Sequence, residues 1–186
     1  MGRKIGILTA AIAVLAIAVP SSAGASAMQD WETGKLLPVG TQFTAKSNNF
    51  IVENGLGIGP IECPEIVTNN QISANTGSTF GAVQWGSDTT APCYVQGKYM
   101  EYTTGIRWSK LSSVSSGSGT ISMSFETHFI GTCKFSGEVP FTYVKGSNSI
   151  HISSKIATNF ETICGPAYIK GDFKLALLNG KPILLT

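Results

Sequence analysis

The sequence predicts an all-β protein: an antiparallel β-sandwich or flattened β-barrel held by two disulfides. Three observations lead to this prediction. Short runs alternate apolar and polar residues, turn-forming residues separate these runs, and four cysteines define two intervals of nearly equal length. Alternation with period two is typical of a strand with one buried face. Many such runs at regular spacing indicate a sandwich or a barrel.

The clearest alternating run covers residues 121–129. The apolar residues that share its predicted buried face are Ile121, Met123, Phe125 and Phe129. Polar residues, among them Glu126 and His128, occupy the opposite face. Similar runs cover 133–139, 150–156 and 173–177, so each of these segments is expected to form a strand.

Two kinds of connection separate the predicted strands. Asn179-Gly180 lies between two apolar runs and predicts a hairpin with a type I′ turn, in which both central residues have positive φ. The Ser- and Gly-rich stretch 112–119 predicts a loop before the strand at 121–129.

The first residues predict a cleavable signal peptide. Arg3 and Lys4 precede an apolar run that is shorter than the roughly 20 residues of a membrane span. Cleavage sites of the A-x-A type occur at 23–25 and 25–27, and we favour the second. Residues 1–27 are then removed, 28–40 form an N-terminal extension, and 41–186 form a single all-β domain.

The charge of the chain limits its partners. Without Arg3 and Lys4, 11 basic residues balance 11 acidic residues, and the basic residues form no cluster. Nucleic acid is therefore not an expected partner. No second apolar stretch predicts a membrane span after removal of the leader. The expected location is secreted or extracellular, with cell-envelope or carbohydrate contact as the candidate interaction.

The four cysteines are expected to form disulfides because exported chains reach oxidising compartments. Four cysteines allow three pairings, and sequence does not decide among them. The near-equal intervals lead us to predict Cys63–Cys93 and Cys133–Cys164, each closing one half of the chain. Each bridge is expected to contribute about 3–4 kcal/mol by restricting the unfolded chain.

Several segments resemble a group of uncharacterised exported, signal-peptide-bearing β-rich proteins of actinobacteria with four cysteines. The segments that carry the resemblance are the Ala-rich leader, 40–46, 61–63, 132–137, 164–167 and the C-terminal hairpin. This resemblance covers most of the chain beyond the leader. It implies an exported β-domain and assigns no functional residues.

Few residues qualify for catalysis. The two histidines, His128 and His151, fall on predicted solvent faces, and surface positions are the expected role for both. A metal or acid–base site would require neighbouring strands to bring them to Glu126 or Glu161. No serine nucleophile motif occurs, and the remaining carboxylates are scattered. We therefore predict no catalytic residue, no metal site and no cofactor.

Aromatic residues are the remaining candidates for ligand contact. Trp85 shares its strand face with Val83, and Trp108 shares its face with Ile106, so both tryptophans are expected in the core. Tyr99 and Tyr102 lie in a less regular segment and are the predicted ligand patch.

The expected function is a secreted, non-enzymatic binding or structural module of the extracellular space or cell envelope. Two alternatives stay open. The first is a carbohydrate-active β-sandwich enzyme that uses Glu126 with a second acid. The second is a self-assembling envelope protein, because a chain with few charges leaves its strand edges poorly protected.

Overall fold

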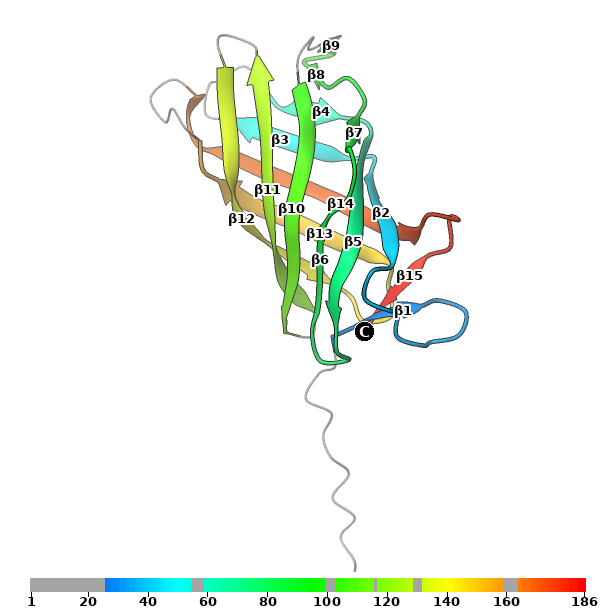
Figure 1. The fold of residues 1–186 in the computed structure, drawn as a ribbon. Helices are drawn as coiled ribbons and strands as arrows, with labels where there is room; N and C mark the ends of the chain where they lie inside the picture. Colours follow the sequence, from blue (N-terminus) through cyan, green and yellow to red (C-terminus); the bar gives the residue numbers. More distant parts are fainter. Residues whose placement is uncertain (1–25, 55–58, 100–102, 116, 129–131, 159–163) are drawn as a thin grey trace, which may run out of the picture.

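A computed structural model describes residues 26–54, 59–99, 103–115, 117–128, 132–158 and 164–186 of the chain. The described part is built from β-strands (Figure 1). Their bounds are β1 Met28–Asp30, β2 Gln42–Ser47, β3 Phe50–Asn54, β4 Ile61–Cys63, β5 Ile66–Asn75, β6 Phe80–Gln84, β7 Thr89–Thr90, β8 Tyr94–Val95, β9 Lys98–Tyr99, β10 Thr103–Ser115, β11 Ser118–His128, β12 Thr132–Tyr143, β13 Ser149–Ile156, β14 Ala167–Leu177 and β15 Ile183–Leu185.

Eight antiparallel strands form a closed barrel. Their order around the barrel is β13, β12, β11, β10, β6, β5, β2 and β14, and pairing between β13 and β14 closes the ring. The predicted all-β class is confirmed, and of the two predicted architectures the barrel is correct. Closure removes the exposed edges that an open sheet of these strands would have.

β14 is shared between the barrel and a side sheet. Its second half pairs with β2, while its first half pairs with β3. From β3 the pairing continues through β4 and β8 to β9. A separate two-stranded sheet, β1 with β15, lies beside the lower part of the barrel in Figure 1. Among the described residues, no helix has the length and apolar character needed to cross a membrane.

Aromatic rings form much of the core. Trp108 and Phe173 are both fully buried, with ring centroids 4.7 Å apart. Phe125 and Phe135 face each other across β11 and β12 and stack at 4.8 Å. Stacking of this kind adds about 0.5–1.5 kcal/mol per pair to the gain from burial.

The alternation predicted for residues 121–129 and 150–156 is confirmed. In β11 the apolar residues Ile121, Met123 and Phe125 are buried, and Ser124 on the opposite face is exposed. In β13 all three isoleucines are buried, whereas His151 faces solvent. Phe129 lies outside the described residues.

The two predicted connections differ from the structure. Positive φ occurs at Gly180 but not at Asn179, so this turn is not type I′. Only an isolated bridge joins Ala176 to Pro182 before β15 turns to pair with β1. Pro182 lacks the backbone N–H that a continuing ladder needs.

The predicted loop at 112–119 is also wrong over most of its length. Ser112 pairs with Thr120, Ser113 with Gly119, and Ser115 with Ser118. β10 and β11 therefore continue almost to a tight turn at Gly117, where φ is +86°. The long pairing of the two strands outweighs the weak strand preference of serine and glycine.

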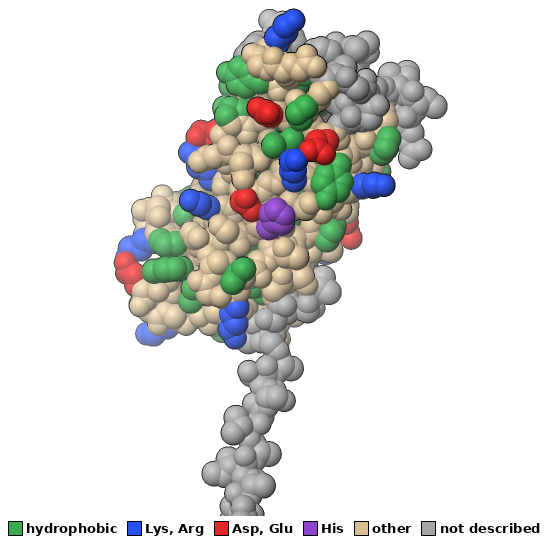
Figure 2. All heavy atoms as spheres, turned by 180° about the vertical axis from the view of Figure 1, so that it is seen from behind, with side chains coloured by type: hydrophobic (Ala, Val, Ile, Leu, Met, Phe, Trp, Pro, Cys, Tyr) green, Lys and Arg blue, Asp and Glu red, His purple; other side chains and the backbone are tan. Residues whose placement is uncertain are grey.

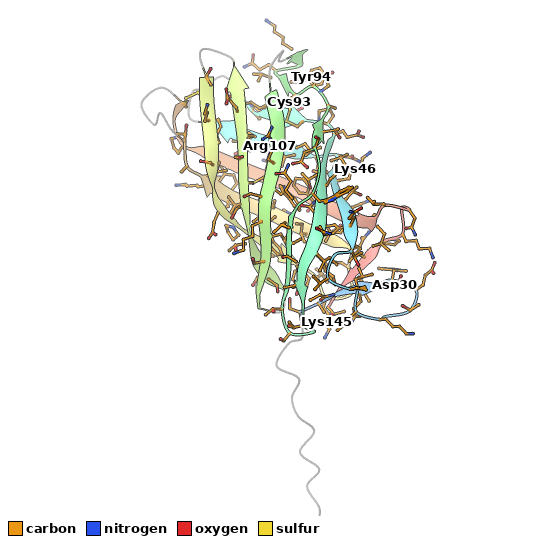
Figure 3. The ribbon with its side chains drawn as sticks, viewed as in Figure 1. Asp30, Lys46, Cys93, Tyr94, Arg107 and Lys145 are labelled. Atoms are coloured by element: carbon orange, nitrogen blue, oxygen red, sulfur yellow. A yellow bond between two sulfur atoms is a disulfide. The ribbon has the colours of Figure 1, made fainter. Side chains whose placement is uncertain are left out.

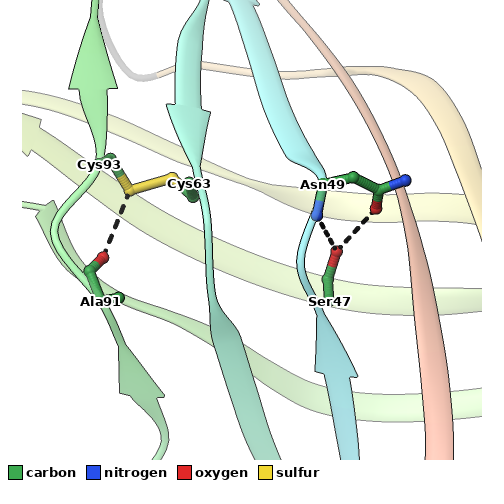
Figure 4. The surroundings of a disulfide bond; sticks show 5 residues. All are labelled: Ser47, Asn49, Cys63, Ala91 and Cys93. Atoms are coloured by element: carbon green, nitrogen blue, oxygen red, sulfur yellow. Dashed lines mark hydrogen bonds between the residues drawn. A yellow bond between two sulfur atoms is a disulfide. The ribbon is translucent and has the colours of Figure 1, made fainter. Parts of the chain in front are cut away.

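Both predicted disulfides are confirmed: Cys63–Cys93 and Cys133–Cys164. The first joins β4 to the segment before β8, and the Ser47–Asn49 turn lies nearby (Figure 4). The second joins barrel strand β12 to the segment before β14. The two disulfides indicate an oxidising, non-cytoplasmic setting.

Candidate functional site

The site begins where β6 stops between its two neighbours. β6 pairs with β10 as far as Val83 and with β5 as far as Gln84, after which the chain leaves the barrel wall and returns as β7. Beyond the end of β6, the carboxylate of Asp88 takes the position between β5 and β10. It accepts hydrogen bonds from the backbone N–H of Asn69 on β5, at 2.9 Å, and from that of Trp108 on β10. The Gln84 side-chain amide also donates to it, at 3.3 Å.

The environment of Asp88 shifts its pKa upward. Partial burial is the largest cause, because it removes water from the charged carboxylate. The backbone N–H groups of Asn69 and Trp108 and the positive charge of Arg107 act in the opposite direction without reversing the shift. The Asp88 carboxylate therefore serves as a hydrogen-bond acceptor within the barrel wall, and the positive charge of Arg107 lies near it.

Arg107 lies between two hollows on the outer surface of the barrel. A hollow of about 230 Å³ is lined by Gln84, Gly86, Ser87, Asp88 and Arg107. A larger one, of about 340 Å³, is lined by Arg107, Ser124, Phe125, Glu126, Lys134, Phe135 and Ser136. We call the two together the Arg107 groove. Figure 3 shows Arg107 in the upper half of the barrel.

The Arg107 groove runs across the strands. It passes from the end of β6 over β10 and β11 to β12. Strands lie about 4.8 Å apart, so three such steps give a length of roughly 14 Å. The two hollows together therefore extend over a length that matches an extended ligand better than a single ion.

The groove offers both donors and acceptors of hydrogen bonds. Within the described part of the chain, the Arg107 guanidinium makes no hydrogen bond or salt bridge to another residue. The group is permanently charged and has five N–H donors in a fixed planar arrangement. Glu126 and Lys134 face each other across β11 and β12, with Lys134 Nζ 3.4 Å from Glu126 Oε2. Lys134 is exposed and Glu126 is partly buried. Ion pairs at the surface contribute little to stability, so a polar ligand can compete for these two side chains.

Trp85 is exposed, contrary to the prediction from sequence. Its side chain is 42% accessible, and that of Val83 is 38% accessible. Both residues lie on the outward-facing side of β6 and its extension, so their shared face is the outer surface and not the core. In the chain, Trp85 lies between Gln84 and Gly86, which both line the smaller hollow. Trp108 is in the core as predicted; the side chain of Ile106 lies outside the described residues.

His151 belongs to a different polar cluster. Figure 2 shows a face of the protein on which a histidine side chain lies beside an acidic one. His151 Nδ1 lies 2.8 Å from Asp172 Oδ1 on β14. Asn49 donates to the other carboxylate oxygen at 2.8 Å and accepts from the Asp172 backbone N–H at 2.9 Å. The Asn49 hydrogen bond is the largest cause that lowers the pKa of Asp172, followed by the bond from His151.

The meeting of His151 with Glu126 that a metal or acid–base site would require does not occur. Glu126 pairs with Lys134 on β12, whereas His151 pairs with Thr142, eight positions further along the same strand. Eight strand residues span about 26 Å. Glu161 and the side chain of His128 lie outside the described residues. Within the described ranges, no group of three His, Cys, Asp or Glu side chains is arranged to hold a metal ion.

The predicted tyrosine patch lies largely outside the described residues, which exclude Tyr102 and the side chain of Tyr99. The backbone of Tyr99 pairs with Tyr94 in the β8–β9 hairpin. Tyr94 is 37% accessible and lines a third hollow, of about 410 Å³, beside the Cys63–Cys93 disulfide.

Sequence reasoning missed Arg107 and Asp88. One signal was present: Arg107 is the only arginine after Arg3. A single arginine in a chain that otherwise uses lysine indicates a need for the planar, multiply donating guanidinium. The part played by Asp88 depends on where β6 ends, and no local pattern encodes that.

Comparison with known proteins adds no family and no function to this description. The chain matches no protein-family model, and no curated protein or solved structure matches it. The actinobacterial resemblance therefore stays a prediction, and the geometry of the chain itself carries the functional argument.

Proposed function

We propose that the protein is exported and acts as a non-catalytic binding module of the extracellular space or cell envelope, with a saccharide as its ligand. The observation that carries this proposal is the position of Arg107 in the lining of both hollows, with its guanidinium without a hydrogen-bonding partner among the described residues. Sugars present many hydroxyl groups, and a site that binds them needs donors and acceptors close together. The groove supplies donors from Arg107 and Lys134 and acceptors from Glu126 and Asp88.

Trp85 supports the same ligand class. Trp85 is adjacent in the chain to two residues that line the smaller hollow, and its exposed indole offers a flat apolar surface for the C–H face of a sugar ring, while the charged groups bind its hydroxyls. The export part of the proposal is supported by the leader-like residues 1–27 and by the two disulfides.

The binding test uses the mature, disulfide-bonded protein and two sets of oligosaccharides, one of neutral hexoses and one containing uronic acids. Isothermal titration calorimetry is expected to detect binding to at least one set. Arg107→Ala should weaken it about 10- to 100-fold, because one charge-assisted interaction is lost. Lys110→Ala is the matched control, since Lys110 is an exposed cation on the same strand outside both hollows.

A spectroscopic readout separates the groove from other surfaces. Ligand addition should change tryptophan emission in the wild-type protein, and this change should be lost in Trp85→Phe. Equal binding by the wild type and Arg107→Ala, or failure of both oligosaccharide sets to bind, would reject the proposed ligand site. Hydrolysis of the oligosaccharides by the wild-type protein would reject the non-catalytic part of the proposal.

A further inference from the structure

The residues around the two A-x-A sequences are integrated into the fold. Ser26 and Ala27 are 0% and 1% accessible, and Met28 is fully buried. The Ser26 hydroxyl lies 2.7 Å from the hydroxyl of Tyr143, which in turn donates to the carbonyl oxygen of Thr186 at 3.2 Å.

Ala27 extends the two-stranded sheet of β1 and β15. Its N–H donates to the Thr186 carbonyl, and the Thr186 N–H donates back to the Ala27 carbonyl, both at 3.0 Å. The exchange continues the register in which Met28 pairs with Leu185. Ala27 is therefore a strand residue of the folded protein.

The Asn75 side chain holds the next residue from both sides. Its Nδ2 donates to the Met28 carbonyl at 2.6 Å and to the Leu37 carbonyl at 2.9 Å, and its Oδ1 accepts from the Met28 N–H at 3.1 Å. This arrangement suits an amide N–H with one hydrogen. It provides no carboxylate for a charged amino terminus at Met28.

The two cleavage positions have opposite consequences. Hydrolysis after Ala27 would create an ammonium group at the fully buried Met28 nitrogen and remove the partners of Tyr143 and Thr186. Each hydrogen bond that can no longer form lowers the stability of the folded protein. Hydrolysis after Ala25 places the ammonium group on Ser26 and leaves every one of these contacts in place, so the two positions differ by three hydrogen bonds.

We propose that an export signal peptidase cleaves the bond between Ala25 and Ser26, so that the mature chain begins at Ser26. Water adds across this peptide bond, giving a carboxylate on Ala25 and an ammonium group on Ser26. Ala23 and Ala25 then occupy the small-residue positions that such peptidases recognise. The inference rests on the proposed export, and it selects the first of the two A-x-A sites.

The direct test is expression of the full chain in an export-competent bacterium, followed by intact mass measurement and N-terminal sequencing of the exported protein. The expected amino terminus is Ser26. A terminus at Met28 overturns the inference and leaves export standing. A full-length chain retained in the cytoplasm overturns the proposed export, and the processing site with it.

The variant Ala23→Asp tests whether the signal peptidase recognises the first A-x-A sequence, because residue 23 belongs to that sequence only. The Ser26 terminus should disappear in this variant. If Ser26 remains the terminus, the assignment of Ala23 to the cleavage site is wrong.

A stability comparison tests the physical argument separately. Two chains that begin at Ser26 and at Met28 are released from a removable fusion with both disulfides formed. The chain starting at Met28 should melt about 5–10 °C lower, since it lacks three hydrogen bonds. Equal Tm values would overturn the argument from packing.

Discussion

The carboxylate of Asp88 accepts a 2.9 Å hydrogen bond from the backbone N–H of Asn69, at the point where β6 no longer reaches β5. The same carboxylate accepts the backbone N–H of Trp108 on β10. One side chain thus bridges two strands that would otherwise have unpaired donors in the barrel wall. Asp88 also places its carboxylate near Arg107. The same residue therefore accepts the backbone N–H groups of the barrel wall and lines the Arg107 groove.

Removal of this bridge should destabilise the barrel. Asp88→Ala leaves two backbone N–H groups without an acceptor and is expected to lower the free energy of unfolding by about 2–3 kcal/mol. Urea denaturation measures the change. Ser87→Ala is the control, because the Ser87 carbonyl and not its side chain accepts from Asn69; it should stay within about 0.5 kcal/mol of the wild type. Equal effects of the two variants would contradict the structural role of Asp88.

Two strand glycines should respond oppositely to alanine. A Cβ at Gly119 would collide with the ring of Phe141 and with the Ser112 carbonyl oxygen, so Gly119→Ala should cost about 1–3 kcal/mol. A Cβ at Gly137 meets only Ile156, at 3.9 Å, and Gly137→Ala should be neutral or stabilise by up to about 1 kcal/mol. Thermal unfolding followed by circular dichroism distinguishes the two. A similar loss for both would show that Gly119 is not sterically constrained.

The two disulfides should protect different parts of the fold. Replacing either pair with serine is expected to cost about 3–4 kcal/mol, since both close loops of similar length. Hydrogen exchange should locate the effects. Loss of Cys63–Cys93 should increase exchange in the side sheet of β3, β4 and β8, while loss of Cys133–Cys164 should increase exchange in β12 and β14 of the barrel. Identical exchange patterns would contradict this division.

Asp172 should make stability depend on pH in acid. Its pKa in the folded protein is lowered from the ordinary value of 3.8, chiefly by the Asn49 hydrogen bond. A carboxyl group with a lowered pKa stabilises the fold above its unfolded pKa, and this contribution is lost as the pH falls from about 4 through the folded pKa. Solvent screening at this half-exposed pair limits the effect to under about 1 kcal/mol.

Asn49→Ala should move the Asp172 pKa back toward 3.8 and flatten this acid dependence. Carbon-13 NMR titration of the Asp172 carboxyl group measures the pKa, and urea denaturation between pH 2 and 7 measures the stability. Asn48→Ala is the control, because Asn48 is an exposed amide one residue away. An unchanged Asp172 pKa in Asn49→Ala would refute the assigned cause.

Periodicity predicted the strands well where one face is buried, as at Ile121, Met123 and Phe125. It failed where pairing partners decide the outcome: the serines of 112–115 belong to β10 because β11 pairs with them. For Trp85, the period correctly placed it on the same face as Val83. Which of the two faces of that strand is buried depends on the curvature of the closed barrel, and a short segment does not contain this information.

The sequence by itself determined the all-β class and the alternation of the long strands, because strand period is a local property. Cysteine spacing favoured the two disulfide pairs, and the tertiary structure decided among the three possible pairings. Only the tertiary structure decided that the sheet closes through β13 and β14, that Asp88 replaces β6 between two strands, and that Arg107 lies between two hollows. These relationships join residues distant in sequence, so they depend on strand order and register around the barrel. Ser26 and Ala27 illustrate the same difference: their sequence is typical of a leader, and their contacts with Tyr143 and Thr186 make them part of the fold.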